Sequence, residues 1–111
     1  MYKILIADDE VLLRKEIIVL LKRGNIPFRS IVEAENGYEA LKAIEEDPPD
    51  IAILDIKMPG MSGIELSETV HRKKLDTKVI IVSGYADFSF ARDALRFGVV
   101  DYILKPIDDD K

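Results

Sequence analysis

The fold is decided by the stretch IAILDIKMPGMSG at residues 51–63, in which a continuous apolar run ends at Asp55 and a Pro-Gly turn follows. An apolar run without polar alternation is typical of a strand that is buried on both faces of a parallel sheet. Asp55 then lies at the carboxyl end of this strand, on a rigid element but close to solvent. In an open parallel sheet, the carboxyl ends of the strands form the crevice where ligands bind. The stretch therefore predicts an α/β fold with a functional carboxylate at one edge of the sheet.

Three more apolar runs in the chain, at residues 4–6, 79–82 and 102–104, lead to residues with specific chemistry. These residues are the acidic pair Asp8 and Asp9, the hydroxyl of Ser83, and Lys105 with Pro106 after it. If all four strands are parallel, three carboxylates, a hydroxyl and an ammonium converge at the same edge of the sheet. That set suits a divalent metal ion, a phosphoryl group and a carboxylate nucleophile.

Helical segments alternate with these strands, which predicts right-handed crossovers and a doubly wound sheet. A second strand is expected around residues 30–35, where apolar and acidic residues mix as in an edge strand. The capping-box spacing of Ser62 and Glu65 marks the start of one helix. Other helix boundaries are expected at Gly24, Asn36, Gly98 and near Asp87.

Length and composition indicate one domain, because 111 residues are enough for one hydrophobic core but not for two. The chain has no cysteine, which excludes disulfides and thiolate metal sites. Its net charge of −5 argues against nucleic-acid binding by this chain itself. No apolar run reaches membrane-spanning length, and Met1 to Lys3 lead straight into a strand without room for a signal peptide. We therefore expect a cytoplasmic domain.

Each candidate residue also has a purely structural interpretation. Asp8 and Asp9 would serve equally well as the N-cap of the next helix, Lys105 as a solvated surface lysine, and Ser83 as an ordinary strand-end hydroxyl. The functional interpretation makes the acids ligands of a hard cation such as Mg²⁺. Asp55 then acts as a nucleophile that forms an aspartyl phosphate, with the metal and the lysine neutralising its charge.

Taken in this order, one motif per strand, these residues resemble a receiver domain of a two-component response regulator. The resemblance covers nearly the whole chain and includes Tyr102 and the Met58-Pro59-Gly60 turn with Gly63. It implies a flavodoxin-like, doubly wound sheet of five parallel strands in the order 2-1-3-4-5. It also implies a phosphorylation switch, a signalling module rather than an enzyme that turns over a substrate.

The resemblance assigns the acceptor and the metal ligands. Asp55 would be the phosphoacceptor, and a phosphohistidine on a sensor histidine kinase would be the donor. Asp9 and Asp55 would bind Mg²⁺ through their side chains, Lys57 through its backbone carbonyl, and Asp8 mainly through water.

The resemblance also assigns the residues that respond to phosphorylation. Lys105 would pair with the phosphoryl group, Ser83 would move toward it, and Tyr102 would turn inward into the space that Ser83 leaves. Gly84 would keep the acceptor open to the donor. Lys57 and Tyr85 occupy positions that tune the lifetime of the aspartyl phosphate in this family.

A finer resemblance concerns the residues at 83–88 and 101–108, which are similar to receivers joined to AraC-type helix-turn-helix domains. We therefore expect a C-terminal DNA-binding effector domain in the full-length protein. The family's fifth helix should follow Lys105, but Ile107 to Lys111 are too few to form it, so we expect a chain truncated at its C-terminus. The absent helix would leave an apolar strip beside the first helix and favour self-association.

Two other functions stay open at this point. A Mg²⁺-dependent phosphotransferase or phosphohydrolase could use Asp55 covalently on a small molecule, although no general acid or base follows it and no cap domain would enclose a substrate. A degenerate receiver could serve only as a docking surface, although the complete set of acids and Lys105 argues against that function.

Overall fold

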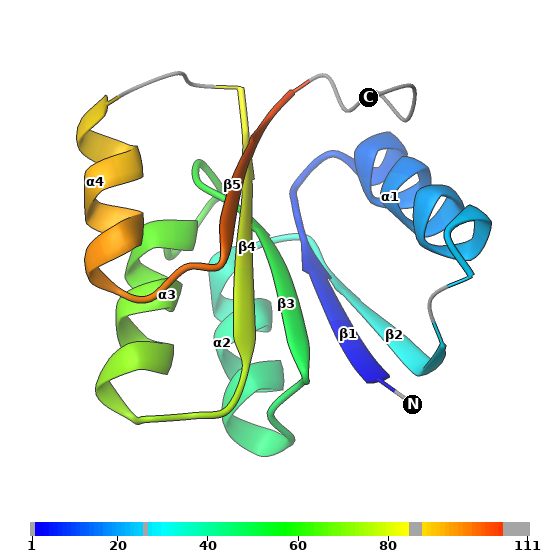
Figure 1. Cartoon of the computed structure of the whole chain (residues 1–111), viewed down its shortest axis with the longest axis horizontal. Helices are drawn as coiled ribbons and strands as arrows, with labels where there is room; N and C mark the ends of the chain where they lie inside the picture. The colour runs from blue at the N-terminus through cyan, green and yellow to red at the C-terminus, as the bar shows by residue number, and fades with distance from the viewer. Residues whose placement is uncertain (1, 26, 85–87, 106–111) are drawn as a thin grey trace.

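The computed structural model describes residues 2–25, 27–84 and 88–105, and it is a three-layer α/β/α arrangement (Figure 1). The strands are β1 (Tyr2–Ala7), β2 (Phe28–Ala34), β3 (Ile51–Asp55), β4 (Lys78–Ser83) and β5 (Asp101–Leu104). The helices are α1 (Val11–Arg23), α2 (Gly37–Glu46), α3 (Gly63–Arg72) and α4 (Phe88–Arg96). All strand pairs are parallel, and their order is β2-β1-β3-β4-β5. The predicted doubly wound sheet and its strand order are confirmed.

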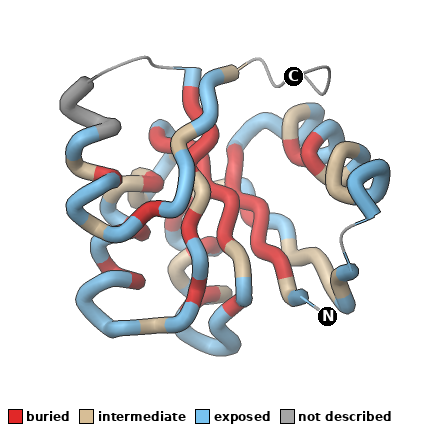
Figure 2. The backbone as a smooth tube through the Cα atoms, viewed as in Figure 1, coloured by how far each residue is buried: buried red, intermediate tan, exposed pale blue. Residues whose placement is uncertain are grey.

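The central strands supply both hydrophobic cores, because successive side chains on a strand point to opposite faces of the sheet. On β1, Leu5 faces the core that α2, α3 and α4 cover, whereas Ile4 and Ile6 face the core beneath α1. On β3, Leu54 faces the core covered by α2, α3 and α4, and Ile53 faces the core beneath α1. Figure 2 shows the buried residues concentrated in these inner strands. Both faces must therefore be apolar, which explains the continuous runs in the sequence.

Most predicted boundaries are confirmed, and one structural interpretation is wrong. Asn36 caps α2, and Ser62 forms a complete capping box with Glu65 at the start of α3. The N-cap of α1, however, is Glu10, which makes no side-chain cap. Asp8 instead accepts a hydrogen bond from the backbone N–H of Glu10 (2.8 Å). Its other carboxylate oxygen therefore stays available for contacts across the sheet.

The mixed strand β2 lies at an edge of the sheet, as its composition predicts. At the opposite edge, β5 carries two apolar side chains, Ile103 and Leu104, that are exposed. The expected fifth helix, Pro106, Tyr85 and the predicted start of α4 at Asp87 lie outside the described residues. No helix in the described ranges is long and apolar enough to cross a membrane.

Candidate functional site

The carboxyl ends of the parallel strands lie along the same edge of the sheet (Figure 1). Asp8 follows β1, Asp55 ends β3, Ser83 ends β4 and Lys105 follows β5. The register aligns Asp55 with Val82, so Ser83 lies one position beyond the partner of Asp55. Because parallel strands bring these ends together, residues as distant in sequence as Asp8 and Lys105 become neighbours.

Lys105 binds the acidic residues at the centre of this edge. Its Nζ lies 3.1 Å from Oδ2 of Asp8 and 3.2 Å from Oδ2 of Asp55. It also lies 3.3 Å from Oε1 of Glu10, a residue that is not in the predicted set. The signal for Glu10 in the sequence is its place as the third acid of the run Asp8-Asp9-Glu10.

Burial strengthens the electrostatic interactions among these charged side chains. Asp8 is 2% exposed, Asp55 is 6% exposed, and the Lys105 side chain is 17% exposed. Burial and the nearby charge of Asp8 raise the pKa of Asp55 to about 6, although Lys105 opposes this rise. Burial alone would lower the pKa of Lys105, but hydrogen bonds and charges from Asp8 and Asp55 outweigh it and leave that pKa raised. Lys105 is therefore a cation at neutral pH, and Asp55 is an anion of unusual basicity.

The acidic run offers a set of oxygens that fits a hard cation. One carboxylate oxygen from each of Asp8, Asp9 and Glu10 lies within 4.8 Å of the others. Asp9 and Glu10 are exposed, so a cation there would keep several waters, which is how Mg²⁺ usually binds. Oxygen donors without sulfur or imidazole favour Mg²⁺ over softer metals.

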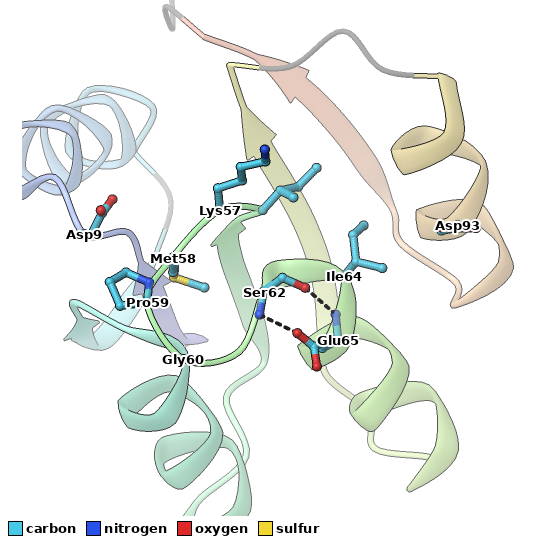
Figure 3. Close-up of a pocket in the computed structure, with 10 residues that line it drawn as sticks. Asp9, Lys57, Met58, Pro59, Gly60, Ser62, Ile64, Glu65 and Asp93 are labelled. Atoms are coloured by element: carbon cyan, nitrogen blue, oxygen red, sulfur yellow. Dashed lines mark hydrogen bonds between the residues drawn. The ribbon is translucent and has the colours of Figure 1, made fainter.

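Asp55 lines a cavity of about 560 Å³. Its lining residues are Asp9, Glu10, Asp55, Lys57, Gly84 and Lys105. A Cβ placed on Gly84 would meet no atom of the described residues within 4 Å, so no part of the chain that the structure describes closes this side of the cavity. Lys57 extends the site along the loop after β3, where a neighbouring cavity of about 610 Å³ lies between that loop, Asp9 and Asp93 of α4 (Figure 3).

The loop between β3 and α3 is fixed by close backbone contacts. The N–H of Gly63 donates to the carbonyl of Ile56 (3.0 Å), and the N–H of Gly37 on α2 donates to the carbonyl of Pro59 (2.9 Å). A Cβ on Gly63 would lie 2.2 Å from the backbone carbonyl oxygen of Asp55. The capping box drawn in Figure 3 holds the first turn of α3 beside this loop. The backbone of Asp55 is therefore held by its own strand and by the helix that follows.

The predicted switch residues occupy the neighbouring strands β4 and β5. Ser83 is fully buried at the end of β4, and its carbonyl accepts the backbone N–H of Lys105 (2.8 Å). Tyr102 is half-buried and packs against the larger core, on the face covered by α4. The sheet thus connects Ser83 to the strand that carries Tyr102, while the movement of either side chain stays a prediction.

The sequence matches the response regulator receiver domain family over residues 4–111. The chain belongs to this family, as its sheet order and its strand-end residues predict. The coarser part of the functional prediction, a receiver domain of the kind found in transcriptional response regulators, is therefore confirmed.

Individual relatives agree with this assignment. An uncharacterized transcriptional regulatory protein of Bacillus subtilis, YesN, is 37% identical over the full chain, which spans 30% of YesN. The transcriptional regulatory protein HptR of Staphylococcus aureus is also 37% identical, over 97% of the chain and 42% of HptR. The chain thus spans less than half the length of these relatives.

Solved structures share the fold. A DNA-binding response regulator of the LuxR family from Staphylococcus aureus is 35% identical, with a TM-score of 0.88 over 97% of this chain and 89% of that one. The receiver domain of AraT from Geobacillus stearothermophilus is 36% identical, with a TM-score of 0.85 over 96% and 83% of the two chains.

The raised pKa of Asp55 predicts how stability depends on pH. Below about pH 3 this carboxyl is protonated in both the folded and the unfolded protein, whereas above about pH 6 the folded protein holds an ionised carboxylate that it disfavours. Without metal, Asp55→Asn should therefore be more stable than the parent by about 3 kcal/mol above about pH 7, since the pKa rises from 3.8 to about 6 and one pKa unit corresponds to about 1.4 kcal/mol. This advantage should shrink as the pH falls through 6 and disappear by about pH 3. Urea unfolding in EDTA across this range measures it, and a constant difference between the two proteins would contradict the assigned pKa.

Proposed function

We propose that this domain is a phosphoacceptor switch in which Asp55 receives a phosphoryl group from a sensor histidine kinase. The observation that carries the proposal is the partly buried ammonium of Lys105 in contact with both Asp8 and Asp55. A carboxylate can attack phosphorus as a nucleophile when the charge of the transferred group is neutralised. An oxygen of Asp55 forms the new P–O bond, the P–N bond of the phosphohistidine breaks, and the imidazole nitrogen keeps the electron pair and takes up a proton.

Mg²⁺ would supply part of the charge neutralisation. Asp9 and Asp55 would hold it through their side chains, Asp8 through water and Lys57 through its backbone carbonyl. Lys105 would exchange a contact with a carboxylate for one with the phosphoryl oxygens. Catalysis then consists of positioning and electrostatic stabilisation, without a general acid or base. For this reason we propose a domain that promotes only its own phosphorylation and dephosphorylation, not an enzyme with a separate substrate.

We further propose that phosphorylation biases a two-state element made of Ser83 and Tyr102. A ligand shifts such an equilibrium only through contacts that differ between the states, here those of Ser83 and Lys105 with the phosphoryl group. In a longer protein the output would be transcriptional, through a C-terminal DNA-binding domain of the AraC type. The transcriptional names of YesN and HptR, with lengths well beyond this domain, support that proposal. The acidic receiver itself would not touch DNA, and it would work in the cytoplasm.

The test is phosphorylation by a small donor, which needs no cognate kinase. Incubation with acetyl phosphate and Mg²⁺ should add the mass of one phosphoryl group, and EDTA should prevent the addition. Intact-mass spectrometry measures both. A protein that gains no mass at saturating donor and Mg²⁺ would contradict the proposal. Repeated turnover of a simple phosphate ester would instead favour a phosphohydrolase.

A further inference from the structure

We propose that Arg14 is a positioning residue for the metal site, holding the loop that carries the acidic run. This inference rests on the proposed function, because it assumes that the acids bind Mg²⁺. Arg14 lies in the first turns of α1, and its side chain is only 10% exposed although it carries a charge. Arginine is seldom buried unless it is paired, so its partners indicate its role.

The two partners of Arg14 come from different parts of the sheet. Its Nη1 donates to the backbone carbonyl of Asp8 (2.6 Å), and its Nε donates to Oε1 of Glu33 on β2 (2.9 Å). One guanidinium therefore connects α1, the loop after β1, and the edge strand. The two atoms that Arg14 contacts, the Asp8 carbonyl oxygen and Oε1 of Glu33, are not among the expected metal ligands. Arg14 would therefore affect the metal only through the loop that it holds.

With the contact from Arg14 to its carbonyl, every polar group of Asp8 has a partner. The N–H of Asp8 donates to the carbonyl of Ala34 (3.0 Å), one carboxylate oxygen accepts from Glu10, and the other contacts Lys105. The carbonyl is its one remaining polar group, and Arg14 binds it. Because a peptide group is planar, fixing the Asp8 carbonyl also fixes the N–H of Asp9 and the direction in which Asp9 leaves the loop. Arg14 thus orients the residue expected to bind the metal directly.

A lysine at position 14 could not make both of these contacts with the same geometry. The guanidinium presents donors in a rigid fork, whereas an ammonium is a point charge on a flexible stem. The charge also matters, because Arg14 lies behind a run of three acids that repel one another. Glu33 orients the guanidinium from the other side. Since a buried ion pair contributes little net stability compared with apolar residues of similar size, the pair is better explained by the geometry it imposes on the loop.

The test compares Mg²⁺ affinity with fold stability in matched variants. Arg14→Met keeps an unbranched apolar stem but loses the guanidinium and both of its hydrogen bonds, and it should bind Mg²⁺ roughly 10-fold more weakly, the lower end of the loss seen when the partner of a metal ligand is removed. Arg14→Lys should recover only part of that loss. Glu33→Gln keeps an acceptor for Nε and should stay within about 3-fold of the parent, well short of the loss expected for Arg14→Met. Calorimetric titration gives the affinities, and thermal melts give the stability of each variant.

The outcomes separate this proposal from the proposed function. Asp9→Ala serves as the reference, because it should lose affinity if the acids bind metal at all. If Asp9→Ala loses affinity while Arg14→Met binds Mg²⁺ as the parent does, the arginine is only structural and the positioning role is wrong. If the parent itself binds no Mg²⁺, both proposals are wrong. Should Arg14→Met fail to fold in thermal melts, Arg14→Lys decides the question, and parental affinity in it would overturn the inference.

Discussion

Asp55→Asn is expected to abolish phosphorylation of this domain by acetyl phosphate, the largest effect of any single substitution. The amide is nearly the same size as the carboxylate, so the cavity and the strand are kept. It lacks the negative charge that, in the proposed function, would attack phosphorus and help to bind Mg²⁺. Among the described residues, Asp8 is the one other carboxylate that is buried at a strand end and contacts Lys105, and its second oxygen is held by the backbone N–H of Glu10.

The matched control is Asp93→Asn on α4, which removes a carboxylate from the neighbouring cavity without touching Lys105 or the acidic run. This variant should gain one phosphoryl group, as the parent does. Intact mass after equal exposure to donor and Mg²⁺ distinguishes the three proteins. An Asp55→Asn protein that still gains a phosphoryl group would show that the acceptor is another residue.

Gly63→Ala is expected to cost about 3 kcal/mol of stability, a large part of what a domain of this size has. The new methyl group would lie 2.2 Å from the backbone oxygen of Asp55 and 2.9 Å from the carbonyl carbon. Both neighbours are backbone atoms, so no side chain can rotate away. Either α3 or the end of β3 must shift, and the second movement would displace the acceptor itself.

Gly84→Ala is the control for that substitution. Its Cβ would meet nothing within 4 Å in the part of the chain that the structure describes, so the domain should unfold at nearly the same urea concentration as the parent. Equilibrium urea unfolding in EDTA measures the free energy of unfolding of both variants. The slope of that free energy against urea concentration should be the same in both, which shows that they unfold in the same transition. If Gly63→Ala is as stable as Gly84→Ala, the approach of α3 to β3 is looser than the structure has it.

The sequence predicts the sheet well because strands that are buried on both faces must be continuous apolar runs, which are easily recognised. Every residue of a run such as 51–54 must be apolar when helices cover both sides, and parallel strands then bring Asp55 and Lys105 together with no further information. The helix starts at Asn36 and Ser62 are equally readable, since a side-chain cap needs a particular residue type at a particular position.

The contacts of the longer charged residues could not be predicted in this way. Arg14, Glu33 and Glu10 have residue types that usually face solvent, so their default interpretation is a hydrated surface. Whether Arg14 reaches Glu33 depends on how α1 crosses the edge of the sheet. The contact between Glu10 and Lys105 joins residues 95 positions apart, and it depends on side-chain geometry at the edge rather than on any local pattern.

The three contacts of Lys105 also determine what phosphorylation would change. Because its Nζ already lies 3.1 to 3.3 Å from oxygens of Asp8, Asp55 and Glu10, the lysine is a tethered counterion in the resting protein. Much of the loss of rotational freedom that accompanies ordering a long cationic side chain has therefore occurred before any donor arrives. An incoming phosphoryl group would exchange partners with an ammonium that is already in place. The resting and phosphorylated states would then differ in which oxygens share this cation, not in whether the cation is ordered.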